Sequence, residues 1–297
     1  MKILDFLKPS DLEVCVALGF FDSIHIGHSA IINRAKEVAN TYKVKSAVFT
    51  FENDIDSIIK GNKGLVLTYE ERLKKLSKLS IDTVISTIFT KEFSNLSAIE
   101  FFNLLTKNIN VKAIVCGRDY RFGNKGVGDV ALLKSLCKEK SITVEIVDDV
   151  ILDNERVSTT RIKNLLLLGD IKTANVLLGE SYSISGEVVH GREVGRQMGF
   201  PTANVIIPSE KAKLKLGVYK THVIIDGKRY NGITNYGARP TFNLDDVLTE
   251  TYIDGYVGDL YGQSATVYFD DFIRDCVKFD TVDGLICQLK NDLEKIR

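Results

Sequence analysis

Residues 14–28 read VCVALGFFDSIHIGH, a stretch that decides the fold of the first half of the chain. Residues 14–18 are a short apolar run of the kind that forms a buried strand, and helical spacing of apolar residues begins soon after His28. A strand that turns into a helix is the repeating unit of a parallel sheet covered by helices on both faces. Ligands bind beyond the carboxyl ends of such strands, where helix N-termini offer free N–H groups to phosphates, so this turn is a candidate phosphate site.

The same alternation of strands and helices continues to residue 178. It predicts buried strands at residues 45–51, 83–88, 111–116 and 143–147, and helices at 97–107 and 129–139. Thr68 and Glu71 have the spacing of a capping box, which marks a further helix start. Two short helices follow at residues 158–168 and 170–178, each closed by a glycine. The first half is therefore expected to be a Rossmann-like α/β domain with a parallel sheet.

After Gly179 the pattern changes to short strands separated by Gly, Asn and Asp. Strands are predicted at residues 182–189, 217–225, 228–233 and 264–269. Asp226-Gly227 is typical of a type I′ hairpin turn. These features favour an antiparallel β-barrel or sandwich, followed by an amphipathic helix near the C-terminus. The expected domains are residues 1–180 and residues 183–297.

Composition narrows the function classes. The 297 residues suit about two domains, and 39 Lys+Arg balance 39 Asp+Glu, so neither a general nucleic-acid binder nor an anionic-membrane binder is expected. No apolar run approaches the roughly 18 residues of a membrane span, and no signal peptide is expected at the start. The five scattered cysteines contain no CxxC pair, which favours a cytoplasmic setting over a disulfide framework or zinc cluster. The oligomeric state stays open, with a weak homo-oligomer among the alternatives.

His25 and His28 are half of the four histidines in the chain, and Gly27 between them lets the backbone approach a ligand closely. Two imidazoles beside a triphosphate can donate hydrogen bonds to the charge that develops as pyrophosphate leaves. The alternative is that they are two incidental surface histidines in a loop.

The order Gly-x-Phe-Asp, His-x-Gly-His resembles the signature of the HxGH nucleotidyltransferases. Residues 157–163, VSTTRIK, look like the ISSTxIR loop of that superfamily, although Ser-Thr-Thr alone is an ordinary helix cap. A third piece, residues 117–123, follows a predicted strand and suits closure over a planar ligand. The resemblance implies that His25 and His28 are catalytic and that Asp119 and Arg121 contact a flavin. It also implies ATP and phosphate contacts at Gly19, Phe20, Asp22, Ser158, Thr159, Thr160, Arg161 and Lys163.

Residues 186–204 of the second half read GEVVHGREVGRQMGFPTAN, where four glycines surround Arg192 and Arg196. Such a segment suits a flap whose backbone wraps a polyphosphate. Thr202 and Asn204 offer neutral oxygens that suit a Mg²⁺ ion with water and phosphate ligands. Glu250, in a predicted strand, has the chemistry of a base for a substrate hydroxyl, and its alternative is a solvated strand residue.

Together the flap, the PTAN run, the NYGARPT segment at 235–241 and Glu250 resemble the riboflavin kinase module. The whole chain thus resembles the bacterial bifunctional riboflavin kinase/FMN adenylyltransferase family, also called FAD synthetases. The resemblance implies that ATP with Mg²⁺ phosphorylates riboflavin to FMN, and that a second ATP adenylylates FMN to FAD with release of pyrophosphate. In the kinase half, Glu250 is then the base, Thr202 and Asn204 hold Mg²⁺-ATP, Gly191 and Arg196 are flap contacts, and Arg274 contacts the flavin.

Two departures from the family pattern fall in the first half. The usual TF-D/E-P-H-P run is here Thr50-Phe51-Glu52-Asn53-Asp54-Ile55, which removes a contact and is expected to loosen a rigid turn. The closing arginine of the ISSTxIR loop is Lys163, which keeps the charge but not bidentate phosphate binding. Adenylyl transfer is therefore expected to be weakened rather than lost. The alternatives are a riboflavin kinase with a weak or inactive adenylyltransferase half, and a flavin- or nucleotide-binding regulator.

Overall fold

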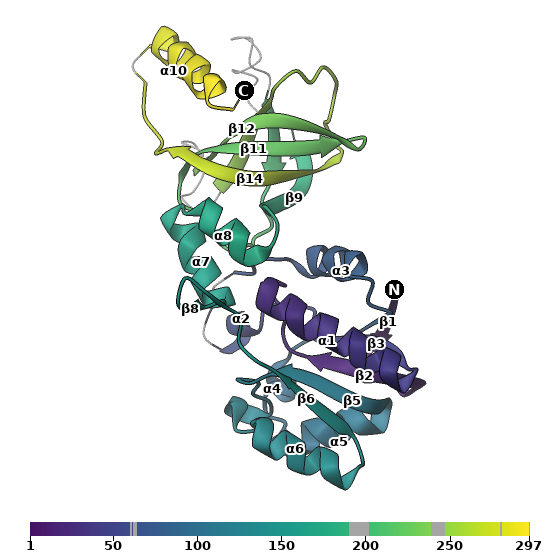
Figure 1. Cartoon of the computed structure of the whole chain (residues 1–297). Coiled ribbons are helices and arrows are strands. Elements are labelled where there is room, and N and C mark those ends of the chain that lie inside the picture. Colours follow the sequence, from purple (N-terminus) through teal and green to yellow (C-terminus); the bar gives the residue numbers. More distant parts are fainter. Residues whose placement is uncertain (60, 62–63, 190–201, 239–246, 280, 297) are drawn as a thin grey trace. The chain divides into compact units, whose positions relative to one another are not determined.

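A computed structural model describes residues 1–59, 61, 64–189, 202–238, 247–279 and 281–296. The chain divides into two compact units, Met1–Thr159 and Thr160–Arg297 (Figure 1). No helix in these described ranges is long and apolar enough to cross a membrane.

The first unit is built on a six-stranded parallel sheet (Figure 1). Its strands, in spatial order, are β1 (Lys2–Asp5), β4 (Thr83–Thr87), β3 (Lys45–Phe51), β2 (Ser10–Leu18), β5 (Ile109–Gly117) and β6 (Thr143–Val147). The predicted parallel sheet is confirmed, and β1 is an edge strand that the sequence pattern did not reveal. β2 lies between β3 and β5, so the strand order reverses there, and this reversal is where ligands bind in open α/β sheets.

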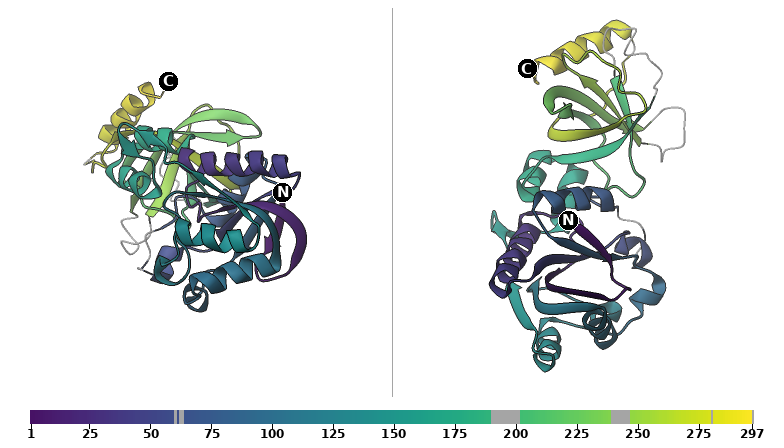
Figure 2. Two further views of the ribbon diagram at one scale, coloured as in Figure 1. Left: turned by 60° about the horizontal axis from the view of Figure 1, so that its bottom comes forward. Right: turned by 90° about the vertical axis from the view of Figure 1, so that its right-hand side faces the viewer.

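Helices cover both faces of this sheet (Figure 2). Apolar residues of α1 (Ile26–Tyr42) and α3 (Tyr69–Lys78) pack in one core, and those of α5 (Ala98–Asn108) and α6 (Val130–Glu139) pack in the other. Thr68 and Glu71 form the predicted capping box at the start of α3. The smaller elements are α2 (Ile55–Ile59), α4 (Lys91–Ser94), the 3₁₀ turn Asn124–Gly126, and the hairpin β7 (Ile151–Leu152) and β8 (Glu155–Arg156).

The second unit contains a closed six-stranded antiparallel barrel, which confirms the barrel alternative. Around the barrel the strands are β10 (Thr202–Ile206), β13 (Val247–Ile253), β12 (Lys228–Ala238), β11 (Gly217–Ile225), β14 (Ser264–Arg274) and β9 (Tyr182–Val189). Asp226 and Gly227 both have positive φ, 50° and 77°, as the predicted type I′ turn requires. α10 (Val282–Glu294) packs on the barrel through a cluster of Val218, Ile233, Leu293 and Ile296.

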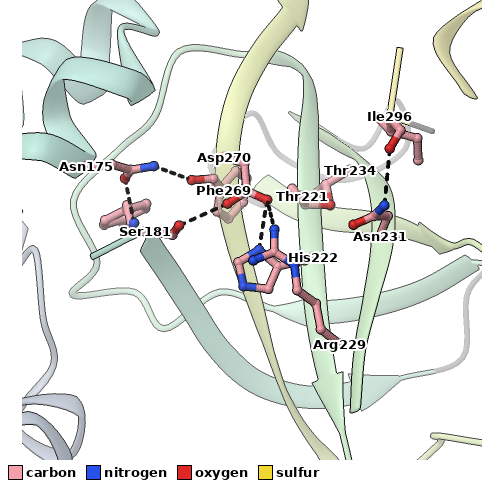
Figure 3. A network of polar contacts seen from close by, with 11 residues as sticks. Asn175, Ser181, Thr221, His222, Arg229, Asn231, Thr234, Phe269, Asp270 and Ile296 are labelled. Carbon is pink, nitrogen blue, oxygen red and sulfur yellow. Dashed lines mark hydrogen bonds and ion pairs between the residues drawn. The ribbon is translucent and has the colours of Figure 1, made fainter. Parts of the chain in front are cut away.

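Two helices, α7 (Thr159–Leu168) and α8 (Ile171–Leu178), precede the barrel, and α8 packs against β14 and β9. The side chain of Asn175 in α8 donates to the Phe269 carbonyl of β14 at 2.8 Å and accepts from the Tyr182 N–H of β9 at 2.7 Å. Nearby, the Asp270 carboxylate binds Ser181, His222 and Arg229 at 2.9, 2.8 and 3.1 Å (Figure 3). The compact units therefore divide near residue 160, whereas the change in sequence pattern placed the boundary near 180.

Candidate active sites

The two histidines of the first half stand at the switch point of the parallel sheet. His25 is the N-cap of α1, and its Nδ1 accepts a hydrogen bond from the His28 N–H at 3.1 Å. The two imidazole rings stack, with centroids 3.7 Å apart and planes at 13°. This cap accounts for the three-residue spacing of His25 and His28, because an N-cap side chain accepts from the N–H group three residues further along. The incidental surface alternative does not fit His25, which is 5% exposed.

Burial keeps this pair uncharged near neutral pH. It lowers the pKa of His25 to about 4, with further lowering by the charges of Arg156 and Lys75. Burial also holds the pKa of His28 well below its ordinary value, and His25, Lys75 and Arg156 act in the same direction. Since Nδ1 of His25 is a hydrogen-bond acceptor, a neutral His25 carries its proton on Nε2. The turn therefore offers an N–H donor rather than a fixed cation.

Thr159 of the VSTT run at residues 157–160 contacts the turn that carries the two histidines. The Ser23 and Thr159 hydroxyls lie 2.9 Å apart, which joins the segment after β2 to the start of α7. Arg156, one residue after the β8 start, pairs with Asp119 at 2.5 Å and with Asp149 at 3.0 Å. Asp119 is also close enough to raise the pKa of His25, against the larger effect of burial. The structure thus brings together the HxGH turn, Thr159 and the predicted flavin contact Asp119.

Arg156 and Lys75 were not singled out in the sequence, although both act electrostatically on the two histidines. Arg156 directly precedes the VSTT run, so its position beside the motif was a usable signal. Lys75 is a half-buried residue inside α3, where a lysine on an amphipathic helix carries no such signal.

The other predicted residues of this half have varied surroundings. A Cβ at Gly19 would lie 2.9 Å from the Phe21 ring, so a larger residue there would require the ring to shift. Asp22 is 3% exposed and accepts from the Val66 N–H at 2.8 Å, which ties the turn to the segment before α3.

Arg121 is exposed, with Asp129 as a distant ion-pair partner at 4.0 Å. Ser158 precedes α7, whose first turns contain Thr160, Arg161 and Lys163.

In the barrel, strand register aligns three polar residues in one row. Asn204 of β10 lies opposite Glu250 of β13, and Glu250 lies opposite Asn235 of β12. Residues opposite each other in antiparallel strands point to the same face, with Cβ atoms about 4.5–5.5 Å apart. Glu250 and Asn235 are exposed, while Asn204 is 3% exposed. The carboxylate predicted as the base is therefore open to a substrate, beside a buried amide.

Thr202 lies two residues before Asn204 on β10, so both side chains are on the same face of the strand. The pair supplies neutral oxygens beside one carboxylate. Among the described residues there is no group of three or more His, Cys, Asp or Glu side chains that could hold a metal ion. This donor set fits a Mg²⁺ ion that keeps water and phosphate ligands, rather than one held in an all-protein cage.

Arg274 belongs to the same row, because Val218 lies opposite both Asn235 and Arg274. Its guanidinium binds the fully buried Asp292 of α10, with Nη2 2.8 Å and Nε 3.0 Å from Oδ2. The contact that the structure gives Arg274 is thus an anchor for α10, and its predicted flavin contact stays a prediction. Gly191 and Arg196 lie outside the described residues.

Asn235 is a functional candidate for which the sequence pattern predicted no individual role. Its segment was part of the family resemblance, so the signal was present. Its Oδ1 also accepts a weak hydrogen bond from the Cys276 thiol at 3.5 Å.

Comparison with known proteins assigns each half of the chain to a family. The FAD synthetase family model matches residues 7–161, and the riboflavin kinase family model matches residues 178–297. A bifunctional riboflavin kinase/FMN adenylyltransferase of Listeria monocytogenes is 34% identical, over 97% of this chain and 93% of the relative. Proteins with the same name from Haemophilus influenzae and Escherichia coli K12 are 32% and 31% identical, over 95% and 96% of this chain and 93% of each relative.

One solved structure is similar over the full length of the chain. It is described as a macrolide-efflux protein from Streptococcus pneumoniae and is 32% identical, with a TM-score of 0.90, covering 99% of this chain and 98% of its own. Two family models in tandem, together with relatives that match nearly end to end, decide the assignment. The chain belongs to the bifunctional riboflavin kinase/FMN adenylyltransferase family.

Proposed function

We propose that this chain makes FAD in two steps. The barrel transfers the γ-phosphate of ATP to riboflavin, which gives FMN, and the first unit then transfers AMP from a second ATP to FMN and releases pyrophosphate. The observation that supports this proposal is that each unit brings predicted catalytic groups together: the stacked pair His25 and His28 in one unit, and the row Asn204–Glu250–Asn235 in the other.

In the kinase step, Glu250 is the base for the 5′-hydroxyl of the ribityl chain. Its exposed carboxylate can accept the hydroxyl proton as the oxygen bonds to the γ-phosphorus and the bond to ADP breaks. Thr202 and Asn204 would hold Mg²⁺ with ATP, where the ion neutralises phosphate charge. Gly191 and Arg196 contact the phosphates from the flap, and Arg274 contacts the flavin.

In the adenylylation step, a phosphate oxygen of FMN bonds to the α-phosphorus of ATP while the bond to the β-phosphate breaks. No nucleophile from the enzyme is required. The Nε2–H of His25 and the His28 ring donate to the leaving pyrophosphate, and Arg156 and Lys75 add positive charge nearby. Gly19, Phe20, Asp22, Ser158, Thr159, Thr160, Arg161 and Lys163 line the nucleotide site, and Asp119 and Arg121 lie toward the flavin.

An active adenylyltransferase half is favoured over an inactive one by the state of the Asn53 turn. The Asn53 side chain donates to the Phe89 carbonyl at 2.9 Å and accepts from the Phe89 N–H at 2.7 Å. These two bonds hold the turn that the missing prolines were expected to leave loose. The functional domains proposed are residues 1–180 and 183–297, in a cytoplasmic enzyme with small-molecule substrates.

Two variants test the proposal by separating the half-reactions. Glu250→Gln should lower riboflavin phosphorylation by about 10²–10⁴-fold and leave FMN adenylylation intact. His28→Asn should do the reverse. Glu187→Gln, which removes an exposed carboxylate from β9, is the matched control and should change neither rate. If Glu250→Gln phosphorylates riboflavin at the wild-type rate, the proposed kinase site is wrong.

A further inference from the structure

Arg72 in α3 is a fully buried cation that neither reaction has used so far. It is 0% exposed, and it contacts backbone and hydroxyl oxygens rather than a carboxylate. Burial lowers its pKa to about 10, against the charges of Asp22, Tyr69 and Asp54. The guanidinium therefore stays charged at neutral pH, and its burial is costly unless its donors are satisfied.

Nearly all of its donors are satisfied at the carboxyl ends of two neighbouring strands. Nη1 donates to the Phe20 carbonyl at 3.1 Å and to the Thr50 hydroxyl at 2.7 Å. Nη2 donates to the Phe51 carbonyl at 2.7 Å and, more weakly, to the Glu52 carbonyl at 3.4 Å. Nε has no hydrogen-bond partner in the part of the chain that the structure describes.

The Phe20 carbonyl oxygen therefore accepts two hydrogen bonds, one from Arg72 and one from Thr50. The Thr50 hydroxyl, itself held by Arg72, donates to the same oxygen at 2.6 Å. The Phe20 ring also lies against the guanidinium, with its centroid 4.9 Å from the Arg72 Cζ, and the Tyr69 ring lies 5.6 Å away. The point where β2 leaves the sheet is thus bound to β3 and to α3 through one side chain.

The segment that follows Phe20 is strained and depends on such anchors. Phe21 and Ile24 have φ values of 54° and 42°, in the left-handed region that costs a non-glycine residue about 1–2 kcal/mol. Strain of this kind persists only where the surrounding structure imposes it, and it gathers at functional sites. This turn ends at His25, the cap whose ring stacks on His28.

A methionine or leucine would avoid the buried charge, but it would leave the Phe51 carbonyl without the donor that lies 2.7 Å away. A lysine has a single ammonium group, which cannot span both strand ends as a planar fork does. The planar guanidinium therefore matches a need to hold the two strand ends in a defined geometry.

We propose that Arg72 is a positioning residue for adenylyl transfer, which holds the strained turn so that the His25 and His28 rings stay in register with the phosphates of ATP. The proposal rests on the proposed function of the first unit. It predicts that loss of the fork slows the chemical step, because a displacement of about 1 Å can cost about 10²-fold in rate.

The test compares Arg72→Met and Arg72→Lys with the wild type in FMN adenylylation, with riboflavin phosphorylation by the other unit as the internal control. For Arg72→Met, kcat for FAD formation should fall about ten- to a hundred-fold while the KM for ATP changes by less than about three-fold. Arg72→Lys should recover part of the loss, and phosphorylation should be unchanged in both.

Two further variants separate positioning from simple destabilisation. Leu105→Ala opens a cavity in the core on the opposite face of the sheet, so it should lower the melting temperature yet keep kcat per folded molecule. Thr50→Val removes only the hydroxyl that links Arg72 to the Phe20 carbonyl, so it should give a smaller loss of kcat in a folded protein. If Arg72→Met loses no more kcat than Leu105→Ala, or loses only affinity for ATP, the proposal is overturned.

If the wild type makes no FAD, the proposed function is refuted. An NMR titration then still tests whether Arg72 holds the turn that carries His25. The His25 ring signal should titrate near pH 4 in the wild type, and it should move toward the ordinary value of about 6.5 in Arg72→Met as the turn opens to water. An unchanged His25 titration in Arg72→Met would overturn the positioning role.

Discussion

At the residue scale, the low pKa of His25, about 4, makes the stability of the first unit depend on pH. The unfolded chain binds a proton on this ring near pH 6.5, whereas the folded chain does so only near pH 4. Because the unfolded state holds more protons between these values, the stability of the first unit should fall as the pH drops from about 6.5 toward 4.

His25→Asn removes this titration, so the melting temperature of the variant should depend less on pH in that window. Thermal unfolding from pH 4 to pH 8 measures it, with the wild type as reference. The same slope in both proteins would mean that His25 is not the buried neutral group described above.

The pair Arg274 and Asp292 makes a second prediction at this scale. Asp292 is 0% exposed and also accepts from Gln288 at 2.9 Å, so Asp292→Asn leaves a partly buried guanidinium without its carboxylate. Loss of one partner from a buried pair costs about 3–5 kcal/mol, and somewhat less here because Arg274 is 18% exposed. The melting temperature of the barrel should drop clearly, with Glu294→Gln on the exposed side of α10 as a neutral control.

Kinase kinetics with the same variants test the predicted flavin contact. If Arg274 contacts riboflavin as well as α10, Arg274→Ala should raise the KM for riboflavin more than Asp292→Asn does. Equal KM values for the two variants would leave Arg274 with the anchoring role alone.

At the element scale, the turn after β3 is held to the end of β4 by one asparagine side chain. Asn53→Ala removes both bonds to Phe89 and leaves a backbone N–H and a carbonyl without these partners, at a cost of about 1–3 kcal/mol for each buried group left unpaired. The first unit should melt several degrees lower, and FAD formation should fall while phosphorylation does not. Asn103→Ala on the exposed side of α5 should change neither, and the same result for Asn53→Ala would contradict the bracing role.

Elements with continuous apolar runs could be predicted closely from the sequence. β3 matches its predicted range, since a buried parallel strand is apolar on both faces. β6 also matches its predicted range, but it is an edge strand with half-buried side chains and not the buried strand that was predicted. β1 was missed because it is a four-residue edge strand whose side chains are mostly exposed. α7 and α8 were predicted as helices, but local pattern could not reveal that α8 packs with the barrel.

The positions of the motif residues were predictable in part from where the predicted strands end. His25 follows β2 and Asp119 follows β5, and parallel strands bring their carboxyl ends to one edge of the sheet. Thr159 follows the antiparallel hairpin β7–β8, so its position beside Ser23 could not be predicted in this way. Arg72 was not predictable, because its burial depends on carbonyls of residues 20, 51 and 52, which no local pattern connects to α3. The bracing by Asn53 was missed likewise, since it depends on Phe89, far along the chain.

At the scale of the whole molecule, each unit has its own core and its own set of chemical groups. The two half-reactions should therefore be separable between molecules. An equimolar mixture of Glu250→Gln and His28→Asn should form FAD from riboflavin, because FMN made by one variant can reach the other. Either variant alone should form almost none.

The most direct test of the account is a time course of the wild-type chain with riboflavin, ATP and Mg²⁺, in which riboflavin, FMN and FAD are separated by chromatography. We expect that FMN rises first and then declines as FAD accumulates, and that FMN supplied alone is converted to FAD. Accumulation of FMN with no FAD from either substrate, under air and under reducing conditions, would contradict an active adenylyltransferase half. No conversion of riboflavin at all would contradict the account as a whole.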